Sequence, residues 1–521
     1  VLDRSQGNPF FIEEVVRSLI DAGVVYRENG TWRAREAIDS AVVPQSVQSV
    51  ILGREDRLAG NVKRVLQTAS VIGRVFRRQV LAHAQQQAEL EDALWELQDR
   101  ALVYQERTIP EEEYSFKHVL TQETVYHNIL HGRREAIHGQ VAEAIEVLYQ
   151  DSLEEYYEQL AHHCEKGGNV EKAVEYLLKA GEKAKRSSAN EAAVAHLTRG
   201  LELLKTLPET PERIQRELDL QIALGVPLVL TKGHAAAEVE RAYARARELS
   251  GQMGETPQRF QVLLGLERSY LHRGALETAH ELGEQLLTLA QSTQDPTHLS
   301  RAHMMIGEIL YYLGDFAEIL DHCQQGIALC DPQQRRSHIF LYGNDTEIGC
   351  RILEAESLWY LGYPDRALER IERMLALAQE LSHPFTLVFA LYFAAALYQL
   401  RREVQAVQGR VETLLGISAE QGFALYLAWG AVLRGWVLAE RGQEDDGIDQ
   451  IRQGIAARQS TMRLPNALAF LAEAYGKVGQ VEEGLSVLAE ALDRVDASGE
   501  RCWEAELHRL KGELLLQQGE G

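Results

Sequence analysis

Two groups of histidines are the first candidates for chemistry, because neutral imidazole is a common metal ligand. His162 and His163 are adjacent, so on a helix their rings would point about 100° apart, which is not chelating geometry. His127, His131 and His138 follow helical spacing, but a metal site there would need a further converging ligand. We interpret the pair as packing residues and the other three as a half-exposed polar face, and we predict no metal site.

The common motifs of catalysis are absent from the sequence. It has no G-x-x-x-x-G-K-[ST] phosphate loop, no G-x-G-x-x-G after a strand, no G-x-S-x-G and no H-E-x-x-H. A hydrolase with its site in a groove would need a nucleophile beside a base, and no such pair is visible. We therefore expect that the chain is not an enzyme.

A basic segment raises the alternative of DNA binding. Residues 61–80 contain no acid and carry the cations Lys63, Arg64, Arg74, Arg77 and Arg78. The helix expected over 89–100, however, carries the acids Glu89, Glu91, Asp92, Glu96 and Asp99. Carboxylates against a phosphate-lined groove are strongly unfavourable. We expect the basic face to contact an acidic protein surface, and we keep a DNA-binding transcriptional regulator as the alternative function.

The composition restricts the partners of the chain. Its 521 residues include 54 Lys and Arg against 77 Asp and Glu, a formal charge of −23. Such a field repels phosphate, so we do not expect nucleic acid or an anionic membrane as a partner. Five scattered cysteines are too few for a disulfide framework, and the longest apolar run, 385–400, is too short to span a bilayer. We expect a cytoplasmic protein with free thiols.

The strongest pattern in the sequence is an internal repeat of helices. From residue 150 to 516, apolar residues follow the i, i+3, i+4, i+7 spacing of amphipathic helices, with short breaks between them. A turn residue is followed five positions later by a small or apolar residue, in the pairs Gly168 and Ala173, Gly274 and Ala279, Gly314 and Ile319, Gly362 and Ala367, Arg401 and Ala406, Gly442 and Gly447, and Gly479 and Gly484. Each bend needs a residue that tolerates a left-handed conformation, and the next helix needs a small side chain where it crosses its partner.

These units resemble the tetratricopeptide repeat, with longer loops than usual. The strings YLGD (312–315), YLGY (360–363) and YGKVGQ (475–480) match the turn of that repeat. One unit cannot bury its apolar face alone, so the array should stack into a curved solenoid. The predicted fold class is therefore mainly α, an α-α superhelix of the tetratricopeptide type, preceded by a small winged-helix domain with one or two β-hairpins.

The smaller domains are expected in the first 150 residues. Residues 23–32 predict a hairpin with an Asn-Gly turn. Three helices, near 61–72, 77–84 and 89–100, precede two strands, 102–105 and 113–116, which is the order of a winged helix. The predicted segments are 1–40 with a helix and a hairpin, 41–120 as the winged helix, 121–150 as connecting helices and 151–521 as the repeat array.

Two short strings carry a further resemblance. The segment QGNPFFIEE (6–14) is similar to the G-x-P segment in the helical lid of signal-transduction ATPases with numerous domains, in which the proline lies against the adenine. The segment SFKHVLTQE (115–123) is similar to the winged-helix segment whose histidine senses the β-phosphate. Here Val119 replaces the aspartate that follows the histidine in some relatives. Alternatively, the first string is a turn that starts a helix, and His118 is an ordinary residue after a strand.

The C-terminal stretches GWVLAE (435–440) and LKGELLL (510–516) are similar to bacterial ATPase–tetratricopeptide proteins. Such proteins often follow a class III adenylate or guanylate cyclase domain, or resemble large regulators of the maltose-activator type. Residues 1–40 would then be the end of the ATPase lid, and we expect the chain to be a fragment of a larger protein.

The resemblance also implies sites and partners. Gly7, Pro9 and His118 would contact ATP or ADP with Mg²⁺ only in the parent protein, whereas the fragment itself would hold no cofactor. The expected partners are an upstream NTPase domain and a protein or small-molecule inducer in the groove of the repeats. The chain would thus be a non-catalytic sensor and scaffold.

Aromatic residues are frequent on the helices expected to line that groove. They are Tyr311, Tyr312, Trp359, Tyr360, Tyr392, Phe393, Tyr398, Tyr426, Trp429 and Trp436. Aromatics are enriched at binding hot spots, but a stripe at helical spacing favours a core. We therefore mark them as a region and not as a site.

Overall fold

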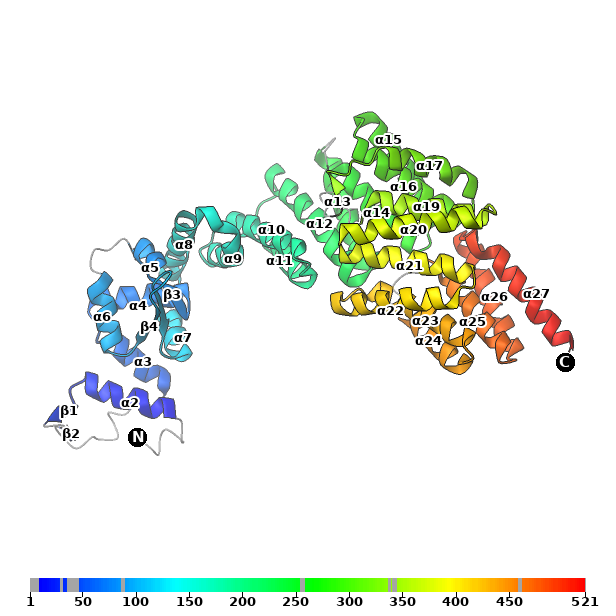
Figure 1. The fold of residues 1–521 in the computed structure, drawn as a ribbon. Helices are drawn as coiled ribbons and strands as arrows, with labels where there is room; N and C mark the ends of the chain where they lie inside the picture. The colour runs from blue at the N-terminus through cyan, green and yellow to red at the C-terminus, as the bar shows by residue number, and fades with distance from the viewer. Residues whose placement is uncertain are drawn as a thin grey trace. The chain divides into compact units, whose positions relative to one another are not determined.

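The computed structural model describes residues 9–28, 31–34, 46–85, 90–253, 258–335, 339, 344–457 and 462–520, and helices dominate it (Figure 1). The chain divides into two compact units. Unit 1 comprises Val1–Ala180 with Glu202–Leu207, and unit 2 comprises Gly181–Leu201 with Pro208–Gly521. In the described part of the chain, no helix has both the length and the apolar character needed to cross a membrane.

Unit 1 combines helices with two small sheets. It opens with α2 (Pro9–Asp21) and the antiparallel pair β1 (Val25–Glu28) and β2 (Thr31–Ala34). The next elements are α3 (Val47–Glu55), α4 (Gly60–Ile72), β3 (Val75–Arg77), α5 (Arg78–Gln85), α6 (Leu90–Asp99), β4 (Val103–Arg107) and β5 (Glu113–Phe116). After them come α7 (Val119–Asn128), α8 (His131–Leu148), the 3-10 turn η2 (Gln150–Tyr156) and α9 (Tyr157–Lys166).

The second sheet of unit 1 has three strands in the order β3–β5–β4. Tyr114 of the central strand pairs with Phe76 on one side and with Gln105 on the other. The sheet shares one core with α4, α5 and α6, which includes the fully buried Leu66, Leu81, Leu94, Leu97 and Phe116. The sequence did not predict β3, because a three-residue strand is too short to show an alternating pattern. The predicted Asn-Gly turn of the first hairpin lies outside the described residues.

Unit 2 is a tetratricopeptide-like superhelix. The division crosses α10 (Val170–Arg186) and α11 (Asn190–Leu204). The array continues with α12 (Pro211–Lys232), α13 (Ala237–Met253), α14 (Arg259–His272), α15 (Leu276–Thr293), α16 (Pro296–Leu313), α17 (Phe316–Ala328), α19 (Thr346–Tyr360), α20 (Pro364–Leu381), α21 (Pro384–Leu400), α22 (Val404–Gln421), α23 (Ala424–Glu440), α24 (Glu444–Ala456), α25 (Leu464–Lys477), α26 (Val481–Ser498), the 3-10 turn η3 (Arg501–Trp503) and α27 (Glu504–Glu520). From α12 to α17 and from α19 to α27, successive α-helices pack together, and α19, α21, α23, α25 and α27 also pack one on the next. This stacking buries a face that no single hairpin could cover.

The bends of the array follow the predicted spacing, with one correction. Glycines with positive φ stand at the expected turns, at positions 168, 274, 314, 362, 442 and 479. At the remaining turn we predicted Arg401, but Arg401 has φ −79° and the left-handed residue is Arg402, with φ 61°. The buried position shifts with it, because Val407 rather than Ala406 is fully buried. The distance of five residues from bend to helix crossing is therefore kept, and only its starting point was wrong.

Candidate functional site

The two predicted nucleotide-contact residues in the described part of the chain stand at the starts of helices. Helix α2 begins at Pro9, where a fixed φ and a missing N–H are tolerated. His118 lies two residues after the end of β5 and is the N-cap residue of α7, with extended backbone angles. Gly7 lies outside the described residues. The local backbone therefore agrees with the alternative of an ordinary helix start as well as with a nucleotide contact.

Glu13 brings these two segments together. It lies about one helical turn beyond Pro9 and accepts a hydrogen bond from Lys117 Nζ. Its Oε2 is 3.8 Å from His118 Nε2. The hydrogen bond from Lys117 lowers the pKa of the Glu13 carboxyl, and burial lowers the pKa of His118. A neutral His118 imidazole keeps one N–H with which it can donate to an oxygen ligand.

The buried side of α2 is fixed by one arginine of α3. Arg54 is 2% exposed, and its Nη1 donates to Glu14 Oε2 at 2.7 Å while its Nε donates to Asp21 Oδ2 at 2.9 Å. Its Nη2 donates to the carbonyl oxygen of Arg100, at the end of α6. Such a charge is tolerated inside a protein only when it is paired and hydrogen-bonded. The helix that carries Pro9 is thereby joined to the domain that carries His118.

The histidine groups of the sequence are closer together than we expected. His138 is 1% exposed, so our placement of it on a half-exposed face was wrong. Its Nδ1 lies 2.9 Å from His163 Nδ1, and its Nε2 lies 3.1 Å from the hydroxyl of Tyr126. Burial lowers the pKa of His138 to about 4 and that of His163 to about 3. Within the described ranges no group of three or more His, Cys, Asp or Glu is arranged to hold a metal ion.

Three of the five cations of the basic segment pair with acids of their own domain. Lys63 Nζ lies 2.7 Å from Asp56, Arg77 Nε lies 3.4 Å from Glu113, and Arg78 contacts Glu91 of α6. Apart from these pairs, α6 exposes Asp92, Trp95 and Asp99. A helix with this face would repel a phosphate backbone, so the geometry does not favour the DNA-binding alternative.

The aromatic region of the array is core. Tyr311, Tyr312, Tyr392, Phe393, Tyr398, Tyr426, Trp429 and Trp436 are buried, whereas Trp359 and Tyr360 are half-buried. Between these rings lies Arg463, which is 2% exposed. Its Nη2 donates to both carboxylate oxygens of Glu356, at 3.0 and 2.9 Å, and its guanidinium stands 4.6 Å from the ring centre of Phe393. This cluster ties together helices far apart in the array, and most of its aromatic rings are closed to a ligand.

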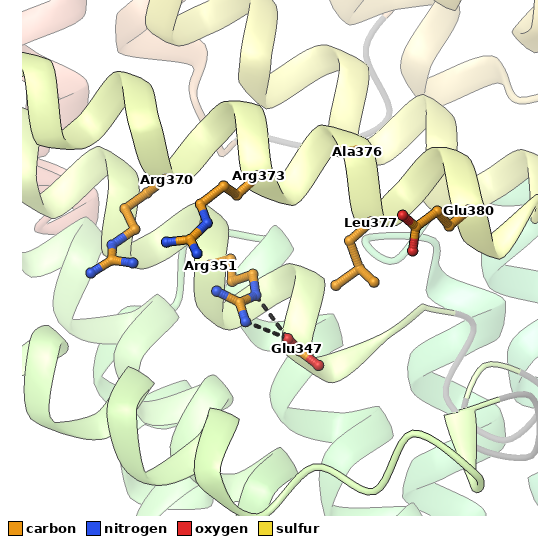
Figure 2. A pocket seen from close by; sticks show the side chains of 7 residues that line it. All are labelled: Glu347, Arg351, Arg370, Arg373, Ala376, Leu377 and Glu380. Carbon is orange, nitrogen blue, oxygen red and sulfur yellow. Dashed lines mark hydrogen bonds and ion pairs between the residues drawn. The ribbon is translucent and has the colours of Figure 1, made fainter.

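An open pocket lies elsewhere, on α19 and α20 (Figure 2). It has a volume of about 490 Å³. Its walls include Glu347 and Arg351 of α19 and Arg370, Arg373, Leu377 and Glu380 of α20. In Figure 2 the side chains of Arg370, Arg373 and Arg351 lie at one end of the labelled group, and those of Leu377 and Glu380 lie at the other. The pocket therefore gathers three cations on one side, with Leu377 and Glu380 farther along α20.

Comparisons with known proteins give distant relatives. No protein-family model matches the chain. A Rhizobium meliloti (strain 1021) protein named Uncharacterized protein R02095 is 24% identical over 526 residues, which cover 99% of this chain and 50% of the relative. The chain thus spans about half the length of this curated relative.

Two solved structures are similar at low scores. A Rap protein complexed with competence and sporulation factor has a TM-score of 0.44 at 12% identity, over 66% of this chain and 99% of its own. A signal transduction ATPase with numerous domains with a tetratricopeptide repeat sensor, PH0952 from Pyrococcus horikoshii, has a TM-score of 0.37 at 12% identity, over 98% of this chain and 71% of its own. We base no functional inference on either, because both scores lie below 0.5.

Sequence reasoning missed the residues that build these sites. Arg54 and Glu14 are 40 positions apart, and no local pattern links them. The pocket left a weak signal, because Arg370, Arg373 and Leu377 follow the i, i+3, i+7 spacing of one helix face. The sequence pattern alone did not identify a pocket, because its other walls, Arg351 and Glu347, come from the preceding helix.

Proposed function

We propose that the chain is the sensor and scaffold region of a signal-transduction ATPase with numerous domains. In this proposal α2 is the end of the ATPase lid, and α4 to β5 form a winged helix. The chain order α4, β3, α5, α6, β4, β5, with the strands arranged β3–β5–β4, supports the second assignment. The repeat array binds a protein or small-molecule inducer and regulates an NTPase or cyclase module elsewhere in the protein.

The contact of Glu13 with Lys117 and His118 carries this proposal. Pro9 and His118 come from separate strings of the sequence, yet the helix of Pro9 reaches the His118 segment through one carboxylate. A nucleotide held against both strings would meet two elements that Glu13 already joins. Release of the nucleotide would then free α2 and the His118 segment together. A switch between two states requires such a coupled change.

The test is His118→Ala in a longer chain that includes the nucleotide domain. A hydrogen bond from imidazole to a phosphate is charge-assisted, so its loss should weaken ADP binding about 10- to 150-fold. ADP dissociation measured with a fluorescent analogue gives the constant. His131→Ala is the matched control, since the side chain of His131 is 76% exposed at the start of α8. Equal ADP affinity of His118→Ala and the unchanged protein would remove the nucleotide-sensor assignment.

A further inference from the structure

We propose that the pocket on α19 and α20 binds the carboxylate of a small ligand whose neighbouring group is apolar, as at the C-terminus of a peptide that ends in leucine. This site is separate from the nucleotide contacts and from the buried aromatic region. It stands whether or not the chain belongs to an ATPase, because it depends only on residues of the array.

The cationic side of the pocket is held in place by acids around it. Glu347 accepts hydrogen bonds from Arg351 Nε and Nη2 at 2.8 and 2.6 Å, and it also contacts Arg335. Its single negative charge is thus shared between two guanidinium groups. Arg370 is held through its Nε, 3.1 Å from Glu354. These contacts orient two arginines before any ligand arrives, which reduces the entropy that binding costs.

Arg373 is the arginine with the most freedom to change partner. Its contact with Glu369 measures 3.3 Å, and both side chains are more than 60% exposed. Exposed pairs of this kind contribute little. A ligand carboxylate can therefore replace Glu369, and the planar guanidinium group matches a carboxylate with two parallel hydrogen bonds.

The remaining walls define what lies beside the carboxylate. Ala376 and Leu377 form the apolar part of the pocket, next to the arginines on the same helix. Glu380 lies seven residues after Arg373, about 10 Å farther along α20. It would repel a second anionic group placed at that end. A ligand with one carboxylate and an adjacent aliphatic group fits these walls better than a dicarboxylate or a polyphosphate.

The experiment compares three probes on the full 521-residue chain by saturation-transfer NMR. N-acetylleucine carries both the carboxylate and the aliphatic group, N-acetylleucinamide lacks the charge, and inorganic phosphate lacks the aliphatic group. We expect N-acetylleucine to bind at least about 10-fold more tightly than either of the others, which corresponds to about 1.4 kcal/mol. Equal binding of the amide would overturn the role of the arginines, and equal binding of phosphate would overturn the role of Leu377.

Variants locate the binding on this pocket. Arg373→Gln should weaken N-acetylleucine binding about 10-fold, and its exposed position avoids a folding defect. Arg366→Gln is the matched control on α20, because Arg366 stacks on Tyr363 outside the pocket. Leu377→Ala should weaken N-acetylleucine and leave phosphate binding unchanged. Unchanged N-acetylleucine affinity in Arg373→Gln, with circular dichroism showing a folded chain, would overturn the proposal.

Discussion

The contact that fixes α2 in unit 1 differs in kind from the contacts that repeat along unit 2. In unit 1, α2 is fixed by Arg54, which reaches Glu14 and Asp21 over 40 and 33 positions of the sequence. In unit 2, helices cross at small or apolar residues that stand five positions after a left-handed residue, as at Gly447 beside Gly435. The first contact links distant positions once, whereas the second recurs at short range. Only contacts of the second kind leave a period in the sequence.

The largest effect is expected from breaking the charged contact of unit 1. Arg54→Met leaves Glu14, which is 1% exposed, without its partner inside the protein. Removing one member of a buried ion pair costs about 3–5 kcal/mol. Hydrogen exchange of the full chain should therefore show faster exchange in peptides from α2 and α3, with the helices of unit 2 unchanged.

Arg17→Met is the control for this change, because Arg17 also pairs with a glutamate of α2. Its contact with Glu13 measures 3.3 Å between side chains that are 35% and 38% exposed. Such a pair contributes about 0–1 kcal/mol. Equal exchange in the two variants would mean that Arg54 does not hold α2.

The second prediction breaks a helix crossing of unit 2. A Cβ atom added at Gly447 would lie 2.7 Å from the carbonyl oxygen of Gly435 and 2.9 Å from the amide nitrogen of Ala439. Gly447→Ala must separate α23 from α24, and overpacking of this kind costs about 1–3 kcal/mol. The midpoint of the array's unfolding transition in urea, followed by circular dichroism, should fall.

Gly416→Ala supplies the matched control in α22. No heavy atom lies within 4 Å of an added Cβ there. The substitution therefore changes only the helix propensity of the backbone at this position. Alanine favours a helix interior over glycine by about 1 kcal/mol, and this variant should be slightly more stable. The same sign of change in both variants would contradict the role of close crossing at Gly447.

The sequence predicted what is local and repeated, and it failed where one residue reaches far. The spacing from bend to crossing predicted the array, and even at Arg402 the error was a single position. The cap of α3 is a local contact of the same kind, because Ser46 Oγ accepts from Ser49 N at 3.1 Å, three residues along the chain. The contacts of Arg54, His138 and Arg463 could not be predicted, because each joins segments whose approach depends on the whole fold. The grouping of the pocket arginines could not be predicted either, because it forms only when α19 and α20 pack together.

The third prediction concerns the buried histidines of unit 1 and pH. The pKa of His163 is lowered to about 3 and that of His138 to about 4, mainly by burial, from an ordinary value of 6.5. Between pH 6.5 and about 4 the unfolded chain binds these protons and the folded chain does not, so stability is present above pH 6.5 and lost as pH falls. Each histidine contributes a slope of up to about 1.4 kcal/mol per pH unit. Urea unfolding at pH 7 and at pH 5.5 measures the loss.

Other buried histidines add to that slope, so variants must isolate the contribution of this pair. His163→Leu should reduce the difference in unfolding free energy between the two pH values. His131→Gln should leave it unchanged, because His131 is exposed. A slope in His163→Leu as steep as in the unchanged chain would show that His163 is already protonated in the folded state.

The smallest change in stability is expected at the contact of α2 with Lys117 and His118. This contact is partly exposed, whereas the contact of α2 with Arg54 is buried. Glu13, Lys117 and His118 have side chains that are 38%, 30% and 31% exposed. An exposed pair contributes about 0–1 kcal/mol, so Lys117→Met and His118→Ala should each change the melting temperature of the 521-residue chain only slightly. The same His118→Ala change should weaken ADP binding strongly in a chain that includes the nucleotide domain. A large loss of stability in the 521-residue chain would instead identify His118 as a packed structural residue, and α2 would then depend on both of its sides.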